Sequence, residues 1–299
     1  MTDAPRTTPA PACAGPDPSP KRPQFQMPRG ACDCHAHVFG PASAYPFAAG
    51  RAYTPPDAPL PAYLGMLDAV GLDRGVLVQP SVYRTDNACL LAALAAAGKR
   101  LRGVVEIDPR GLDDATVDDW TRLGVRGVRM NMAVAGGLPL SELEGIGDRL
   151  AEIGWHLDLI VDRVERIEEI AARLHDLPVP LVVEQMGRIK GGQAVDTPGF
   201  QALLTLLDNG NTWVKLSHAY HISVAGPPYA DTAPFARALA ESALDRLVWG
   251  SDWPHPMLHG PMPNDGDLLD LLASWLPEPA ARQAVLVDNP ARLYGFPAA

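Results

Sequence analysis

Short apolar runs alternate with longer amphipathic segments along most of this chain. The short runs are rich in Val, Ile and Leu, as is typical of buried parallel strands. We predict strands over residues 31–38, 74–81, 102–108, 125–131, 155–161, 180–187, 212–218 and 246–253. The longer segments carry apolar residues near positions i, i+3, i+4 and i+7, and several end in Gly, which is typical of helices. We predict helices over residues 61–71, 87–99, 113–124, 140–154, 164–176, 197–210, 232–244 and 266–276.

This regular alternation predicts the fold class, a single α/β domain folded as a (β/α)8 TIM barrel. The main alternative is a doubly wound open sheet, which usually has a Gly-rich turn after its first strand, where this chain has His-Ala-His. Residues 1–27 are rich in Pro and Ala and predict a disordered tail, which leaves residues 28–299 for the barrel. The long segment 39–61 is expected to lie over the catalytic face.

Composition narrows the choice of partners. The 299 residues carry a formal net charge of −10, which argues against nucleic acid or an anionic membrane, although local arginines could still bind a small anionic substrate. No apolar run reaches the roughly 18 residues of a membrane span. The four cysteines are too few for a disulfide scaffold and favour a reducing cytoplasm. Period-two alternation predicts that Cys32 and Cys34 pack outward, away from the histidines that follow them.

Two histidines, His35 and His37, stand two residues apart at the end of the first predicted strand. Residues i and i+2 of a strand point to the same side, so both imidazoles would face a metal ion, a substrate or solvent. In a barrel, catalytic groups come from the ends of the strands. The last predicted strand ends with Asp252 between Trp249 and Trp253. Because the first and last strands of a closed barrel are neighbours, we expect Asp252 and the two histidines to share one pocket.

Four further motifs extend this pattern: VEQMGR (183–188), WVKLSHAY (213–220), WGSDWPHP (249–256) and NPARLYGF (289–296). Together with His-x-His on the first strand, they resemble the amidohydrolase superfamily. The resemblance is to the branch that contains 2-pyrone-4,6-dicarboxylate lactonase, 4-sulfomuconolactone hydrolase and galactarolactone isomerase, and it spans about residues 30–296. It implies a TIM barrel that acts on small lactones from aromatic or sugar-acid catabolism.

Two departures from the family pattern concern a metal site. Relatives usually carry His where this chain has Gln185, and commonly Gly where it has His218. An amide oxygen is a poor ligand for a transition metal beside imidazole, so we favour a site without a metal and expect Gln185 and His218 to contact substrate. The alternative is zinc held by His35, His37 and Asp252, with His218 or water completing the shell.

The proposed reaction is hydrolysis of a carboxylated lactone by water. It requires a base, for which we predict Asp252 with a pKa raised by its apolar surroundings, and donors to the oxyanion, for which we predict His35 and His37. Alternatives are a lactone isomerase, a metal-dependent decarboxylase and a binding protein without activity. For the small anionic substrate we predict contacts from the rim residues Tyr53, Ser81, Arg84, Thr85, Arg129 and Arg188.

Overall fold

Eight parallel strands form the centre of the protein in a computed structural model that describes residues 10–258 and 260–297. The strands follow one another around the sheet in chain order. They are β1 (Cys32–Ala36), β2 (Arg74–Val78), β3 (Leu101–Val105), β4 (Val125–Asn131), β5 (His156–Ile160), β6 (Leu181–Val183), β7 (Thr212–Leu216) and β8 (Leu247–Trp249). A bridge between Ala36 and Trp253 joins β1 to the segment after β8 and nearly closes the barrel. The predicted (β/α)8 fold is therefore confirmed.

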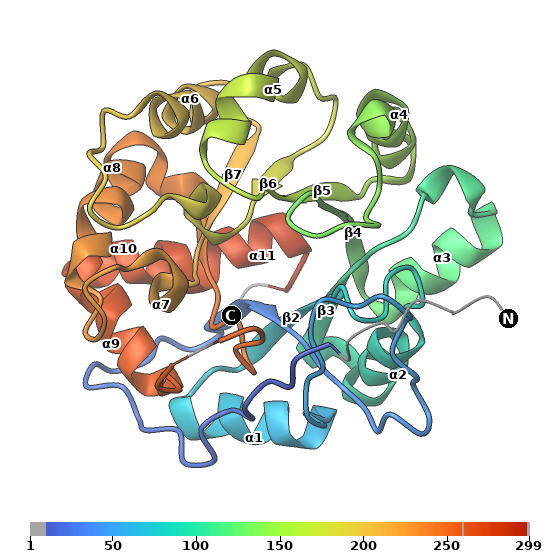
Figure 1. The fold of residues 1–299 in the computed structure, drawn as a ribbon, viewed down its shortest axis with the longest axis horizontal. Helices are drawn as coiled ribbons and strands as arrows, with labels where there is room; N and C mark the ends of the chain where they lie inside the picture. Colours follow the sequence, from blue (N-terminus) through green and yellow to red (C-terminus); the bar gives the residue numbers. More distant parts are fainter. Residues whose placement is uncertain (1–9, 259, 298–299) are drawn as a thin grey trace, which may run out of the picture.

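Helices surround the strands, most of them as an outer ring and α11 near the centre of the view (Figure 1). They are α1 (Leu60–Val70), α2 (Ala88–Ala97), α3 (Asp114–Leu123), α4 (Leu143–Ile153), α5 (Glu165–His175), α6 (Pro198–Leu207), α7 (Ala219–Ile222), α8 (Ala233–Ala243), α9 (Asp265–Trp275), α10 (Pro279–Gln283) and α11 (Asn289–Tyr294). The eight predicted helices are all present, whereas α7, α10 and α11 were not predicted because each is shorter than two turns. Within the described part of the chain, no helix is long and apolar enough to cross a membrane.

A bulge in β1 changes which side chains enter the barrel. Asp33 and Ala36 are three residues apart, yet their partners on β2 are only two apart, so β1 carries one extra residue. The prediction that Cys32 and Cys34 pack outward is therefore wrong. Both thiols belong to a buried cluster with valines of β2, β3, β6 and β8, and Tyr294 of α11 contributes to the same cluster. After the bulge, His35 and His37 also face inward, although they stand at odd-numbered positions and the two cysteines at even-numbered ones.

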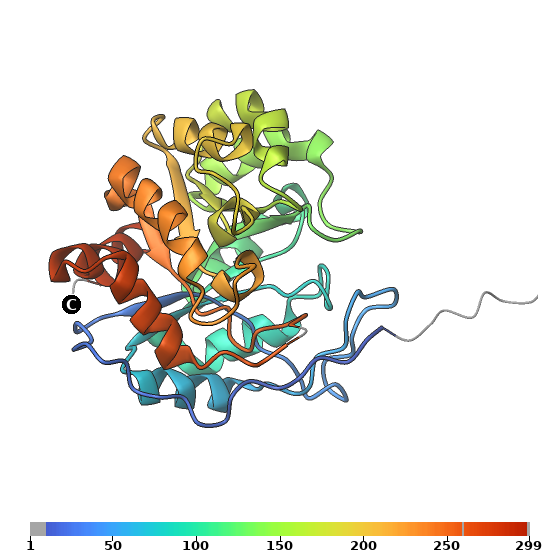
Figure 2. The ribbon, with the colours of Figure 1, turned by 60° about the vertical axis from the view of Figure 1, so that its left-hand side comes forward.

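The N-terminal segment runs along the side of the barrel, in dark blue in Figure 2. The Lys21 amide donates to Asn264 at 2.8 Å, its ammonium pairs with Asp267 at 2.8 Å, and the Gln24 amide donates to Asp270 at 2.7 Å. Residues 10–27 thus have definite partners beside α9, which the Pro- and Ala-rich composition did not indicate. Residues 1–9 of the expected tail lie outside the described residues, and the division into a tail and a barrel domain stays a prediction.

Candidate active site

A cavity of about 220 Å³ opens at the carboxyl ends of the strands. Its lining contains most of the predicted site residues, namely His37, Tyr53, Ser81, Arg129, Gln185, Arg188, His218 and Asp252. His35 is fully buried just beneath, against Asp252. Arg84 and Thr85 do not line the cavity, and Arg84 donates instead to the carbonyl of Gly136. The structure therefore brings together all of the predicted site residues except these two.

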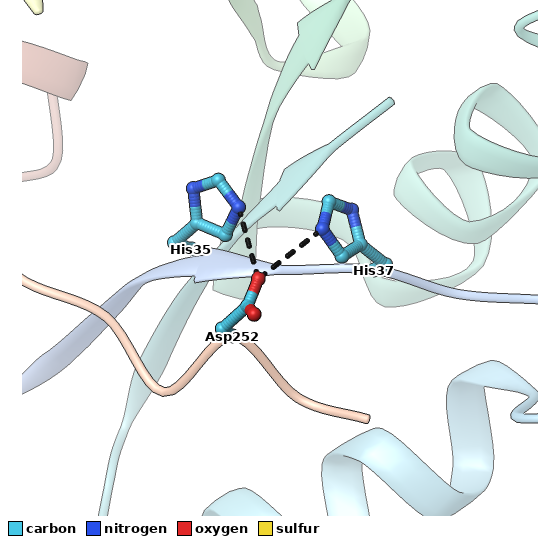
Figure 3. Close-up of side chains that lie close together, drawn as sticks. All are labelled: His35, His37 and Asp252. Atoms are coloured by element: carbon cyan, nitrogen blue, oxygen red, sulfur yellow. Dashed lines mark ion pairs between the residues drawn. The ribbon is translucent and has the colours of Figure 1, made fainter. Parts of the chain in front are cut away.

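The two histidines and Asp252 converge on one point (Figure 3). The carboxylate Oδ1 of Asp252 lies 3.3 Å from His35 Nε2 and 3.4 Å from His37 Nε2. Backbone bonds fix this arrangement, because the Asp252 amide donates to the His35 carbonyl at 2.8 Å. Gly250 makes room for the first imidazole, since a Cβ at that position would lie 2.5 Å from the Cβ of His35. The predicted convergence is thus present at the junction of β1 and the segment after β8.

Asp252 lies among hydrogen-bond donors rather than in an apolar pocket. Its Oδ2 accepts from Tyr220 Oη at 2.5 Å and from His218 Nδ1 at 2.8 Å. Burial alone would raise the pKa of Asp252, but interactions with His218 and the two β1 histidines bring it well below the usual range. The prediction of a raised pKa is therefore wrong, because the flanking tryptophans are not the groups that face the carboxylate. Asp252 is ionised throughout the neutral range.

The surroundings of His35 fix its tautomer. Lys215 Nζ lies 3.3 Å from His35 Nδ1 and donates to Asp158 at 2.5 Å. Because an ammonium has donors but no acceptor, Nδ1 of His35 must be the unprotonated nitrogen and Nε2 carries the hydrogen. Burial also lowers the pKa of His35 to about 4, so the ring is neutral at pH 7. The Nε2–H group therefore points toward Asp252.

The opposite tautomer is fixed at His37. Its Nδ1 lies 2.7 Å from the carbonyl oxygen of Val78, which can only accept a hydrogen bond. A neutral His37 would then present an acceptor at Nε2, and a protonated ring would present a second donor there. That both histidines donate to a substrate carbonyl stays a prediction.

A metal site requires ligand atoms that lie close together. This requirement is met by His35 Nε2, His37 Nε2 and an oxygen of Asp252. The three ligand atoms lie within 4.8 Å of one another. His35 Nε2 and Asp252 Oδ1 are buried and make no well-aligned hydrogen bond within the described part of the chain. Nitrogen and carboxylate ligands in this number suit zinc. These residues could therefore hold one divalent ion if His35 released its Nε2 hydrogen.

The two arginines of the cavity differ in their partners. Arg129 pairs with buried Glu184 through two hydrogen bonds of 2.6 and 3.1 Å, and it donates to the Gln79 carbonyl at 2.9 Å. Its charge is therefore already neutralised by Glu184. Arg188 makes no ion pair with any carboxylate in the described residues. Arg188 is thus the cation of the cavity that remains available to an anionic ligand.

The segment after β6 is held in an unusual backbone conformation. All four residues of η4 (Gln185–Arg188) have positive φ, from 49° to 66°, and three of them are not glycine. Asp252 and His218 also have positive φ, at 65° and 69°. Left-handed backbone at non-glycine residues is strained and is concentrated at functional sites. The side-chain Oε1 of Gln185 is buried without a partner among the described residues.

Several residues of the site could not be assigned from the sequence. His221 and Asn131 line the cavity, and the ring of His221 stacks on His218 with 4.2 Å between centroids. Tyr220 bonds to Asp252, and Lys215 orients His35. Lys215 and Asn131 were visible as polar strand-end residues, but nothing in their spacing revealed these partners.

Comparison with known proteins supports the predicted family. The family model described as Amidohydrolase matches residues 32–296, and the chain belongs to this family. Three curated relatives are similar over most of their length. They are 4-sulfomuconolactone hydrolase of Rhizobium radiobacter (38% identity, covering 95% of this chain and 96% of the relative), 2-pyrone-4,6-dicarboxylate hydrolase of Comamonas testosteroni (38%, 92% and 93%) and D-galactarolactone isomerase of Agrobacterium fabrum (33%, 91% and 93%). The protein is thus an enzyme whose relatives hydrolyse or isomerise lactones.

Proposed function

We propose that this enzyme hydrolyses a small carboxylated lactone, with Asp252 as the general base. The observation that carries the proposal is the convergence of an ionised carboxylate and two oppositely oriented imidazoles at the floor of a small cavity. A water oxygen placed between them would accept from His35 Nε2–H and donate to His37 Nε2 and to Asp252 Oδ1. These contacts would orient the water and increase its nucleophilicity.

The reaction follows from these roles. The water oxygen attacks the lactone carbonyl carbon while Asp252 takes up a water proton, and the carbonyl oxygen becomes an oxyanion. The Gln185 amide and the Arg188 guanidinium line the same cavity and supply donors to negative charge. The ring carbon–oxygen bond then breaks, the ring oxygen takes the proton back from Asp252, and a hydroxy acid leaves the site with the carboxylate of Asp252 restored.

We further propose that the reaction needs no metal. A metal-ligating histidine normally donates its other ring N–H to an acceptor. Here the group nearest to Nδ1 of His35 is the Lys215 ammonium at 3.3 Å, whereas the nearest Glu184 oxygen lies 3.9 Å away. Ligation through Nε2 would leave Nδ1–H facing a cation. The neighbour of His35 therefore opposes the tautomer that zinc requires.

The substrate is proposed to carry one carboxylate beside the reacting ring. Arg188 is the cation available to it, because Glu184 already neutralises Arg129. Tyr53 and Ser81 line the same cavity and add neutral donors. The cavity of about 220 Å³ suits a single ring with short substituents.

A lactone isomerase is the second candidate, favoured by the 33% identity to D-galactarolactone isomerase. In that reaction a substrate hydroxyl replaces the attacking water. Turnover of carboxylated lactones in ¹⁸O-labelled water separates the two, because hydrolysis places one label in the product carboxylate and isomerisation places none. The decarboxylase alternative and the cytoplasmic location stay predictions.

A further inference from the structure

A second cavity, of about 760 Å³, lies at the opposite end of the barrel from the candidate active site. We name it the basal cavity. It is bounded by the first residues of β3 and β4, the end of α3, and the segment 295–297 after α11. Its described lining contains four cations and no carboxylate: Lys99, Arg102, Arg122 and Arg126, of which Arg122 pairs with Asp119 outside the lining. This gathering is unexpected in a chain with 35 acidic and 25 basic residues.

Backbone carbonyl groups hold two of these guanidinium groups in place. Arg102 donates to four carbonyl oxygens at 2.9–3.2 Å. Arg126 donates through Nη1 to two carbonyl oxygens at 2.7 and 2.8 Å, and its Nε and Nη2 have no partner among the described residues. Carbonyl oxygens fix a guanidinium but do not neutralise its charge. Both arginines are therefore preorganised cations without a counter-ion in the described chain.

The segment after α11 shapes the cavity around these cations. Gly295 has φ 64°, and a Cβ there would lie 3.5 Å from Nε of Arg126, so glycine keeps this donor uncovered. The Phe296 ring lies 4.4 Å from the Arg102 guanidinium and 5.2 Å from that of Arg74, an arginine outside the lining that makes no ion pair with a described carboxylate. Nη1 of Arg74 is buried and makes no hydrogen bond within the described residues.

Burial makes these unneutralised charges costly. It lowers the pKa of Arg102 and of Arg126, and the two neighbouring arginines lower that of Arg102 further. An anion that binds beside these arginines would therefore stabilise the folded protein.

We propose that the basal cavity binds a small organic anion that carries a phosphate or carboxylate group. Both groups match the fork geometry of arginine. The anionic group would contact Arg126 and Arg102, and the organic part would pack on Phe296 and Leu94, which also line the cavity. This site is separate from the proposed lactonase site and does not depend on it.

The test is calorimetric titration with inorganic phosphate and with citrate at constant ionic strength. It uses an Arg188→Gln background, so that the cation of the active-site cavity does not contribute. We expect saturable binding of at least one anion, weakened about tenfold or more by Arg126→Gln. The matched control is Arg237→Gln, an exposed arginine on α8 that should change the affinity less than twofold. Arg126→Lys, which keeps the charge, should retain part of the affinity and guards against loss through misfolding.

Three results would overturn the proposal. The first is the absence of saturable binding of both anions in the Arg188→Gln protein while its thermal unfolding stays normal. The second is equal loss of binding in Arg126→Gln and Arg237→Gln. The third is a gain of tenfold or more in phosphate affinity when the C-terminal carboxylate is converted to an amide, because the chain itself would then supply the anion.

Discussion

Replacing Asp252 with asparagine removes the negative charge of the site and keeps its shape. Tyr220 and His218 both donate to Oδ2, so the amide oxygen of the variant should remain there. The amide NH2 group would then occupy the position of Oδ1, next to the lone pair of His37 and opposite the N–H of His35. The amide that replaces the carboxylate cannot take up a proton from water. We expect kcat to fall about 100- to 10,000-fold, which corresponds to roughly 3–5 kcal/mol in the activation barrier.

The Michaelis constant should change less than about threefold, because Arg188 and the neutral donors are untouched. The measurement is steady-state kinetics on a carboxylated lactone that the native enzyme hydrolyses. Asp267→Asn is the control, since Asp267 is an exposed carboxylate paired with Lys21 outside the active-site cavity. A kcat within fivefold of the native value in Asp252→Asn would refute the assignment of Asp252 as the base.

Three more predictions follow from the site. Arg188→Gln should raise KM about tenfold or more with less effect on kcat, and steady-state kinetics with an unchanged KM would contradict the role of Arg188. Tyr220→Phe should lower kcat at least severalfold without altering KM; native kcat would show that its bond to Asp252 is unimportant. Glu106 directly follows β3, and burial raises the pKa of its carboxyl group to about 7, so the protein loses stability as the pH rises above the unfolded pKa of about 4.5. Glu106→Gln should therefore raise the melting temperature at pH 8 more than at pH 5, and an equal shift at both would contradict the titration.

The stability of the protein in acid gives a further prediction, in which the free energy of unfolding decreases as the pH falls rather than as it rises. Burial lowers the pKa of His35 to about 4 and that of His221 to about 3. Between about pH 6.5 and 4 the unfolded chain binds protons that the folded protein excludes, so unfolding becomes easier as the pH falls. Denaturant titrations should show this loss, and His221→Gln should reduce its pH dependence. An unchanged dependence in this variant would contradict the assignment.

Element types were predictable from sequence because the barrel repeats one simple pattern. Strands buried on both faces appear as apolar runs, the eight main helices show 3.6-residue periodicity, and four of these helices, α1 to α4, end at a glycine. The predicted strands ran up to four residues too far, since the apolar residues continue into the segments that leave the sheet to form the site. The helix α11 was missed because it lies across the end of the barrel as a single turn and a half.

The site residues could be predicted only where they are close together in sequence or stand at the ends of predicted strands. His35, His37 and Asp252 met these conditions. The bulge in β1 has no local signal, so the inward direction of Cys32 could not be predicted. The partner of a buried charge depends on three-dimensional packing. For that reason the pairing of Arg129 with Glu184 and the lowered pKa of Asp252 appeared only in the structure.

The most direct test of the account is lactonase activity after exhaustive chelation, measured together with the metal content of the protein. The native enzyme should keep its kcat on a carboxylated lactone with less than about 0.1 equivalent of zinc bound. Gln185→His, which places a further imidazole in the cavity, measures whether the same pocket can gain zinc. Loss of native activity on chelation, with recovery when zinc is added back, would contradict the metal-independent mechanism.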